Sequence, residues 1–185
     1  MEELDFIQEQ QAPLGGAHAL CPVELRHANI NPTTLLATDY LNHYNEVIML
    51  FEMLPDMPDC LEDVEEWQPR SYVEHFQNSG FQGKALAIAA YRHTPASLRA
   101  HFESICAELD KCIIEAAVKA RMLHEQGREA EFRDLCQNAH LRFSPLLDQL
   151  NGAIHGTLDE SLPEPEETTL SDHDQTQADI DALFD

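Results

Sequence analysis

Apolar side chains recur every three to four residues along three long stretches of this chain, the spacing of one face of an α-helix. The first stretch begins near Asn31-Pro32-Thr33, where a proline in the first turn is tolerated, and it ends at Pro55. Its apolar positions are Leu36, Tyr40, Tyr44, Val47, Ile48, Phe51 and Leu54. We therefore predict a helix over residues 33–54.

Two longer helices are predicted toward the other end of this region. Thr94-Pro95 supplies an N-cap and a first-turn proline for a helix that ends at Gly127. The last helix is expected over residues 128–153, with a kink at Pro145. The apolar positions of the two helices are Leu98, Phe102, Ile105, Leu109, Ile113, Ala116, Ala120 and Leu123, and then Phe132, Leu135, Ala139, Phe143, Leu146 and Leu150.

The segment between these stretches carries the helix breakers of the chain. Residues 56–92 are interrupted by Pro58, Pro69, Gly80 and Gly83. Their composition predicts short helices around 60–67, 71–78 and 84–91. No alternation of apolar and polar residues indicates a strand.

The two long helices meet at Gln126-Gly127, so the pattern predicts an antiparallel helical hairpin against which the helix over residues 33–54 can lie. The fold class that we expect is therefore all-α. It is a helical bundle built on this long hairpin, with a disordered acidic C-terminal tail.

Charge supports that division of the chain. The 185 residues contain 34 Asp and Glu against 11 Lys and Arg, a net charge of −23. Residues 157–185 hold ten of the acids and none of the bases, so they carry −10 and the rest carries −13. A segment with a high net charge and few apolar residues tends to be disordered. We expect a flexible N-terminal segment (1–28), a helical bundle domain (29–156), a disordered acidic linker (157–175) and a C-terminal docking peptide (176–185).

Composition also excludes several classes of partner. A surface this acidic repels phosphate backbones and anionic headgroups, so we expect no nucleic acid partner. No apolar run approaches the ~18 residues of a membrane span, and the residues after Met1 lack a basic signal region. We expect no membrane insertion and a soluble, cytoplasmic protein. The pattern carries no signal for an oligomeric state.

Cysteine and histidine spacing predicts no metal site. The cysteines form no C-x-x-C pair and are expected to be small buried residues in a reducing compartment; they are Cys21, Cys60, Cys106, Cys112 and Cys136. The ten histidines raise a metal-bundle alternative, but His43-x-x-Glu46 runs opposite to the Glu-x-x-His order of ferritin-like sites. We expect no cofactor bound by this chain itself.

The final ten residues carry the strongest functional signal. Ile180, Leu183 and Phe184 are spaced to share one face of a short helix, and Thr176 with Asp179 has the spacing of a capping box. A helix of about nine residues does not persist alone in water. An apolar face on such a tethered segment is typical of a peptide that folds when it docks. The alternative is a tail that packs on its own bundle.

Thr-Gln-Ala-Asp-Ile-Asp-Ala-Leu-Phe at 176–184 resembles the N-terminal segment of the flagellar switch protein family FliM, which captures the phosphorylated chemotaxis regulator CheY. The phosphatase family CheZ carries a related peptide at its C-terminus on a disordered linker. The resemblance implies that the partner is a CheY-like receiver. The residues it assigns to that contact are Gln177, Asp179, Ile180, Asp181, Leu183 and Phe184.

A second resemblance lies in the last predicted helix, where Glu131-Phe-Arg-Asp-Leu-Cys-Gln-Asn138 is similar to the catalytic segment of CheZ, acid-Phe-x-Asp-Leu-Thr-Gly-Gln. It implies a phosphatase site in which Asp134 engages the receiver's lysine and Asn138 orients the attacking water. The Mg²⁺ of that reaction would be held by the receiver. The chain departs from the pattern in having the shorter asparagine, and Cys136-Gln137 in place of Thr-Gly.

Several alternatives stay open at this point. Asp134 and Asn138 can be an ordinary solvated helix face. Asn42 with Glu46, and Asp39 with Asn42, offer competing acid–amide pairs, the latter near the acid-x-x-Asn spacing of the CheC and CheX phosphatases. The protein can also be a non-catalytic adaptor or scaffold that docks to the receiver or the flagellar switch, or a helical bundle of unrelated function.

Overall fold

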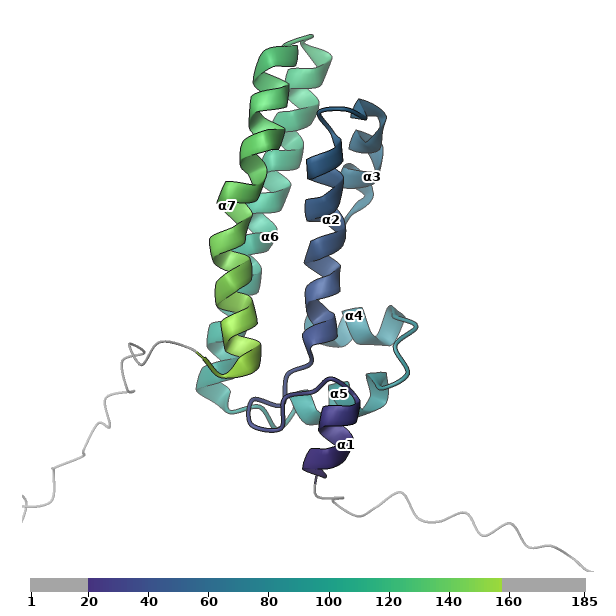
Figure 1. Cartoon of the computed structure of the whole chain (residues 1–185), viewed down its shortest axis with the longest axis vertical. Helices are drawn as coiled ribbons and strands as arrows, with labels where there is room; N and C mark the ends of the chain where they lie inside the picture. Colours follow the sequence, from purple (N-terminus) through teal and green to yellow (C-terminus); the bar gives the residue numbers. More distant parts are fainter. Residues whose placement is uncertain (1–19, 158–185) are drawn as a thin grey trace, which may run out of the picture.

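The computed structural model describes residues 20–157, whose regular elements are all helices, which confirms the all-α prediction for this part of the chain (Figure 1). It contains no strand within that range, apart from one isolated bridge between Ile30 and Ala37. The helices are α1 (Pro22–His27), the 3₁₀ helix η1 (Thr38–Leu41), α2 (Asn42–Met53), η2 (Pro58–Cys60), α3 (Leu61–Glu66), α4 (Tyr72–Asn78), α5 (Lys84–Tyr91), α6 (Ala96–Glu125) and α7 (Glu129–His155).

The longest helices, α6 and α7, lie side by side along most of their length, and α2 packs along α7 (Figure 1). The turn between α6 and α7 contains Gly127 with φ of 65°, a left-handed conformation that glycine adopts without strain. The short helix α3 packs against α2 and α6, while α4 and α5 pack against each other. The long helices therefore form the body of the bundle, and α1, α4 and α5 gather at one end of it (Figure 1).

The core is filled by the predicted apolar stripes. Phe51 of α2 meets Phe143 of α7 with ring centroids 5.4 Å apart in an edge-on arrangement, and both side chains are buried. Between the long helices the buried residues include the small side chains of Ala116, Ala120 and Ala139. Small residues at such positions let two helix backbones approach closely, which explains why α6 and α7 stay in contact over many turns.

Several predicted boundaries are confirmed. Helix α5 has the predicted bounds. Helix α6 begins directly after Pro95, but Pro95 and not the predicted Thr94 is its N-cap residue, and the buried Thr94 hydroxyl has no hydrogen-bond partner within residues 20–157. Helix α4 begins after Ser71, whose hydroxyl accepts a hydrogen bond from the Glu74 amide while the Glu74 carboxylate accepts one from the Ser71 amide. Helix α7 continues through Pro145 to residue 155.

The predicted helix over residues 33–54 is wrong over its first nine residues, since α2 begins only at Asn42. The Asn31 side chain accepts hydrogen bonds from the amides of Thr33 (2.8 Å) and Thr34 (3.2 Å), which turns the chain where a helix was expected. Leu35 then adopts a φ of 63°, outside the helical region.

Residues 20–28, within the segment that we expected to be flexible, contain α1 and bury Leu25. Residues 1–19 of that segment, and the predicted linker from residue 158 onward, lie outside the described residues.

The loop after α1 is bonded to the far end of the chain's last helix. The Thr34 hydroxyl donates a hydrogen bond of 2.6 Å to the carbonyl oxygen of Ile154, and the Asn31 amide donates one of 3.3 Å to that of His155. These carbonyls belong to the last turn of α7, where no amide of the helix itself can reach them. Gly156 follows with φ of 71° and ends the helix.

The environment of the cysteines fits the prediction in part. Cys60, Cys106 and Cys136 are buried and Cys112 is partly buried, but Cys21 is exposed, contrary to expectation. None of the helices in residues 20–157 combines the length and apolar character needed to cross a membrane.

Candidate functional site

Asp134 and Asn138 lie on the exposed face of α7, in contact with each other. The Asn138 amide nitrogen donates a hydrogen bond of 3.0 Å to Asp134 Oδ1 and one of 2.8 Å to the Asp134 carbonyl oxygen. The next residue in each case, Leu135 and Ala139, is buried on the adjoining, core-facing side of the helix. Because buried neighbours fix the rotation of α7, both polar side chains are held toward solvent.

The arginine side chains near Asp134 and Asn138 form ion pairs with other residues. Arg133 pairs with Asp56 at 3.7 Å, and Arg142 lies 4.0 Å from Glu115 of α6. Among residues 20–157, no cationic side chain lies within ion-pair distance of Asp134. The carboxylate is therefore accessible to a cation that a partner supplies.

The competing acid–amide sets are not assembled in the same way. Asn42 and Glu46 are both exposed on α2, without a hydrogen bond between their side chains in the described region. Asp39 accepts a hydrogen bond of 3.3 Å from Asn29 and none from Asn42. Of the pairs that the sequence offered, only Asp134 and Asn138 are brought into contact.

The predicted partner-binding residues lie outside the described residues. They are Gln177, Asp179, Ile180, Asp181, Leu183 and Phe184.

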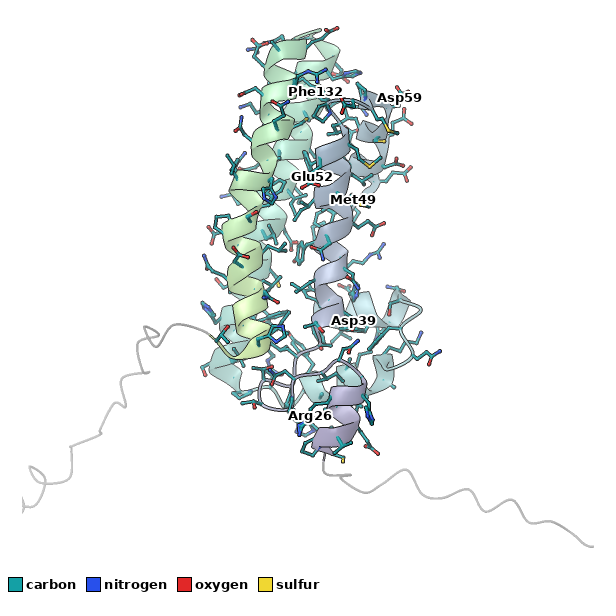
Figure 2. The ribbon with its side chains drawn as sticks, viewed as in Figure 1. Arg26, Asp39, Met49, Glu52, Asp59 and Phe132 are labelled. Carbon is teal, nitrogen blue, oxygen red and sulfur yellow. The ribbon has the colours of Figure 1, made fainter. Side chains whose placement is uncertain are left out.

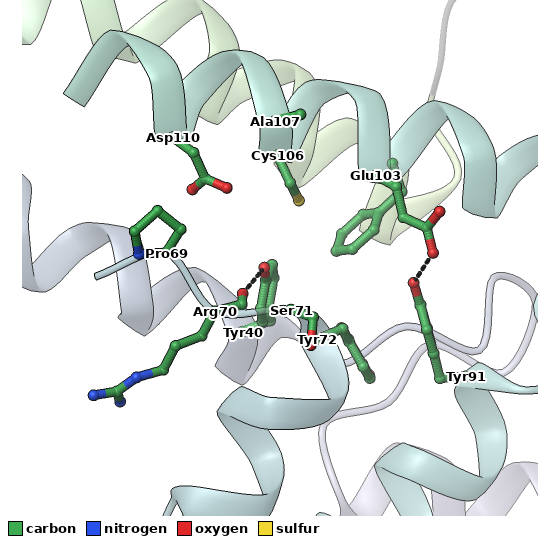
Figure 3. Close-up of a pocket in the computed structure, with 11 residues that line it drawn as sticks. Tyr40, Pro69, Arg70, Ser71, Tyr72, Tyr91, Glu103, Cys106, Ala107 and Asp110 are labelled. Atoms are coloured by element: carbon green, nitrogen blue, oxygen red, sulfur yellow. Dashed lines mark hydrogen bonds between the residues drawn. The ribbon is translucent and has the colours of Figure 1, made fainter. Parts of the chain in front are cut away.

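The side of α6 away from this pair borders a cavity that the sequence analysis missed. It has a volume of about 270 Å³ and lies between α6, η1, the start of α4 and the end of α5 (Figure 3). Its walls are mostly aromatic, formed by Tyr40, Tyr72, Tyr91 and Phe102. Figure 3 shows the carboxylate of Asp110 at one end of the cavity, and the Arg70 side chain directed away from it.

Polar groups that line the cavity form hydrogen bonds with other groups of the protein. The Tyr91 hydroxyl donates a hydrogen bond of 2.6 Å to Glu103, and the Tyr40 hydroxyl donates one of 2.8 Å to the carbonyl oxygen of Arg70 (Figure 3). Burial raises the pKa of the Cys106 thiol to about 12, so this group stays protonated and is a poor nucleophile. The cavity is therefore equipped for packing and binding rather than for covalent chemistry.

The cavity could not be found from local pattern because its walls come from four separate segments. Its one sequence signal is the pair Glu103 and Asp110, which are seven residues apart and share one face of α6. Burial raises the pKa of Asp110, an effect that a hydrogen bond from the Tyr44 hydroxyl partly offsets.

A buried histidine, His43, lies on α2. His43 stacks on Trp67 with ring centroids 4.9 Å apart, and the Trp67 indole nitrogen donates a hydrogen bond of 3.0 Å to the His43 carbonyl oxygen. The His43 Nε2 atom is buried and has no hydrogen-bond partner among residues 20–157. Burial, with nearby His75 and Arg70, lowers the pKa of His43 to about 4. This residue is therefore neutral at physiological pH.

His140 and Glu52 meet across the α2–α7 interface at 3.7 Å, and Figure 2 shows Glu52 on the part of α2 nearest to α7.

Within the range that the structure describes, no three His, Cys, Asp or Glu side chains converge as metal ligands would. No protein-family model, curated protein or solved structure matches this chain.

Proposed function

We propose that this chain is a chemotaxis or flagellar regulator that binds a phosphorylated CheY-like receiver through residues 176–184 and dephosphorylates it with Asp134 and Asn138. In this proposal the α6–α7 pair is the antiparallel hairpin of the bundle, and the acidic segment after it is a disordered tether. Mg²⁺ is held by the receiver, so the chain needs no cofactor of its own.

The observation that carries the catalytic part is the contact between Asn138 and Asp134 on an exposed helix face. The amide nitrogen of Asn138 faces two acceptors on Asp134, which leaves its carbonyl oxygen to accept a hydrogen bond from water. Asp134 retains a second carboxylate oxygen for a cationic group such as a receiver lysine. Hydrolysis of an acyl phosphate depends on positioning and charge placement more than on a strong base, and these two groups supply both.

The water oxygen attacks phosphorus as the bond to the receiver's aspartyl oxygen breaks. The aspartate leaves as a carboxylate, and the released phosphate carries the oxygen and both protons of the water. Asn138 would hold the water in line with the leaving oxygen. Asp134 would orient the amide and pair with the lysine.

Distances along the chain support capture by the tail. Residues 138 and 156 are separated by 18 positions of α7, which is a rise of ~27 Å. A flexible linker of 19 residues spans about 22–26 Å. The peptide can thus hold a receiver near the pair, and a millimolar effective concentration would make weak binding efficient.

Binding by the tail is expected to be weak and reversible. Burial of Ile180, Leu183 and Phe184 contributes roughly 1.5–3 kcal/mol each, and ordering the peptide costs about 2–5 kcal/mol. With polar and main-chain contacts the net is about −6 to −8 kcal/mol, which corresponds to dissociation constants of tens of micromolar to micromolar. Such a value suits a partner that is bound only while it is phosphorylated.

The test is the decay of a phosphorylated CheY-type receiver with Mg²⁺, at saturating amounts of the full chain. We expect faster decay with the wild type, and at least a tenfold loss of the added rate in Asn138→Ala and in Asp134→Ala. Asn151→Ala, another exposed amide on α7, is the matched control and should retain the rate. An unchanged rate in Asn138→Ala would overturn the catalytic assignment.

One observation favours a second candidate, a non-catalytic adaptor that uses the same tail. Gln137 is exposed directly before Asn138, at the position where the CheZ pattern has a glycine. Its side chain occupies space through which a receiver would have to reach Asp134 and Asn138. Ile180→Ala with Leu183→Ala separates docking from catalysis. The adaptor is identified if this double variant loses receiver binding while the substitutions on α7 leave the decay rate of the phosphorylated receiver the same as with the wild type.

A further inference from the structure

The aromatic cavity beside α6 has a carboxylate at each of its two ends (Figure 3). Glu103 and Asp110 both come from α6 and are seven residues apart. They therefore share one face of the helix, about 10 Å apart along its axis. Cys106 lies between them on the same wall (Figure 3). The two acids thus mark the ends of a hollow whose middle is largely apolar.

Each carboxylate keeps one oxygen atom free for a ligand. Glu103 Oε1 accepts a hydrogen bond of 2.6 Å from the Tyr91 hydroxyl, and Asp110 Oδ1 accepts one of 3.0 Å from the Tyr44 hydroxyl. Glu103 Oε2 and Asp110 Oδ2 accept none from other side chains of residues 20–157. The tyrosines hold the two acids in place, and the second oxygen of each acid can accept a hydrogen bond from an ammonium group.

No cation of the described region neutralises these two acids. Neither Glu103 nor Asp110 forms an ion pair within residues 20–157. Arg70 borders the cavity, but its side chain is directed away from it (Figure 3), and Arg99 lies 6.0 Å from the centre of the Tyr91 ring. Burial raises the pKa of Asp110, because it removes water from the charged form. A ligand that brings positive charge would therefore compensate what the fold leaves uncompensated.

The walls between the two acids suit an aliphatic cation. The rings of Tyr72 and Tyr91 are stacked with centroids 4.4 Å apart, and those of Tyr40 and Phe102 are 5.4 Å apart. Aromatic rings attract cations and pack against methylene groups. The volume of about 270 Å³ is just below the ~300 Å³ at which pockets for drug-sized ligands begin. The ligand is therefore expected to be small.

We propose that this cavity binds a small linear diamine, with one ammonium group at Glu103, the other at Asp110, and the methylene chain along the aromatic walls. An extended chain of four or five methylene groups separates its two nitrogen atoms by about 6–7.5 Å at standard bond lengths and angles. With a hydrogen bond of about 2.8 Å at each end, such a ligand is long enough to bridge the two carboxylates. The inference goes beyond the proposed function, because neither Asp134 nor Asn138 borders the cavity.

The second acid favours a diamine over a single ammonium group, such as the side chain of a lysine in a partner protein. A monoamine can pair with one carboxylate and leaves the other without compensation. The net charge of −23 also attracts a dication more strongly than a monocation, wherever on the surface it binds. The experiment must therefore separate the cavity from the general charge of the chain.

Isothermal titration calorimetry of the full-length chain with putrescine and cadaverine tests the proposal. Butylamine and pentylamine are the matched probes that lack the second ammonium group. Measurements belong at about 0.15 M salt, where the screening length is about 8 Å. We expect one diamine to bind per chain, at least tenfold more tightly than the monoamine of the same length. Equal affinities would overturn the two-ended site, and the absence of saturable binding of both diamines up to about 10 mM would overturn the proposal as a whole.

Charge variants test whether the ends of the cavity hold the ligand. Glu103→Gln is expected to weaken diamine binding at least tenfold, to the level of the monoamine. Glu108→Gln, at an exposed acid of α6 outside the cavity, changes the net charge by the same amount and should leave the affinity unchanged. An equal loss in both variants would show that binding follows the net charge alone, which would overturn the site.

A variant that fills the cavity tests its place without changing any charge. Ala107 lies on the α6 wall of the cavity, whereas Ala100 is exposed on α6 outside it. We expect Ala107→Leu to weaken diamine binding at least tenfold and Ala100→Leu to retain it. Circular dichroism verifies that both variants keep the helical content of the wild type. Full binding in a folded Ala107→Leu chain would mean that the diamine binds elsewhere and would overturn the proposal.

Discussion

The hydroxyl of Tyr44 on α2 donates a hydrogen bond of 3.0 Å to the carboxylate of Asp110 on α6. Tyr44 is fully buried and Asp110 is half-buried, so this bond joins two helices at the edge of the aromatic cavity. A carboxylate in such surroundings is easier to keep protonated, which is why burial raises the pKa of Asp110.

Asp110→Asn is expected to stabilise the protein at neutral pH. The asparagine removes a charge that burial disfavours and retains an oxygen that accepts the Tyr44 hydroxyl. Because the pKa of Asp110 is raised in the folded state, the penalty exists only above the unfolded value of about 3.9. Urea unfolding at pH 7 and pH 3 measures this. The gain should vanish at pH 3, and a gain that persists there would contradict the charge explanation.

Tyr44→Phe is the matched change on the other partner. It leaves the Asp110 carboxylate without its hydrogen bond, so we expect a loss of about 1–3 kcal/mol of unfolding free energy at pH 7. In the Asp110→Asn background the loss should be smaller, since an uncharged acceptor is less costly to leave unpaired. Equal losses in both backgrounds would show that the two side chains do not interact.

His43 is expected to make stability depend on pH between 4 and 6.5. Its pKa is lowered to about 4 in the folded protein, against about 6.5 when unfolded. The unfolded chain therefore binds more protons in this window, and stability should fall as the pH drops, by up to about 1.4 kcal/mol per pH unit. His43→Phe retains a ring against Trp67 and should reduce that slope. His93→Gln, at an exposed histidine, is the control and should not change it.

A glycine can be required at a helix end because its φ is positive or because a side chain would have no room, and three glycines of this chain distinguish these two reasons. Gly156 has φ of 71° and its added Cβ would lie 3.2 Å from Thr34, whereas Gly127 has φ of 65° and open space around it. Gly80 has neither constraint. We expect Gly127→Ala to cost about 1–2 kcal/mol, Gly156→Ala at least as much, and Gly80→Ala far less. Thermal unfolding ranks the three, and a Gly80→Ala loss as large as the others would contradict this explanation.

Ser71→Ala should destabilise α4 by about 1 kcal/mol, because it removes the side-chain half of the capping box. Ser71→Asp keeps an acceptor for the Glu74 amide and should recover most of that loss. Urea unfolding followed by circular dichroism measures both variants. A full loss in Ser71→Asp would mean that the hydroxyl acts through some other contact.

Local pattern was sufficient for most of the helices and for part of the site. The start of α4 follows from its capping box, that of α5 from the glycine before it and that of α6 from Pro95, although the predicted Thr94 cap of α6 does not form. The contact between Asp134 and Asn138 follows from their spacing, since residues four apart in a helix are neighbours.

The failures arise where a contact distant in sequence, or a side chain, overrides the local pattern. Leu36 and Tyr40 are buried, as the helical spacing predicted, but they belong to a loop and a 3₁₀ helix. The Asn31 side chain replaces backbone hydrogen bonds there, and Leu35 turns the chain into a left-handed conformation. The aromatic cavity was missed for a related reason, because only tertiary packing brings its four segments together.

The bonds from Asn31 and Thr34 to the last carbonyls of α7 have a mechanical consequence. Helix α7 ends at this point, so a force applied to the chain at residue 157 acts on the end of α7. A helix end held only by its own turn would unravel one residue at a time under such a load. Here the two bonds pass part of the force to a loop more than 100 residues earlier in the chain, so unravelling of α7 from its end requires that these bonds break as well.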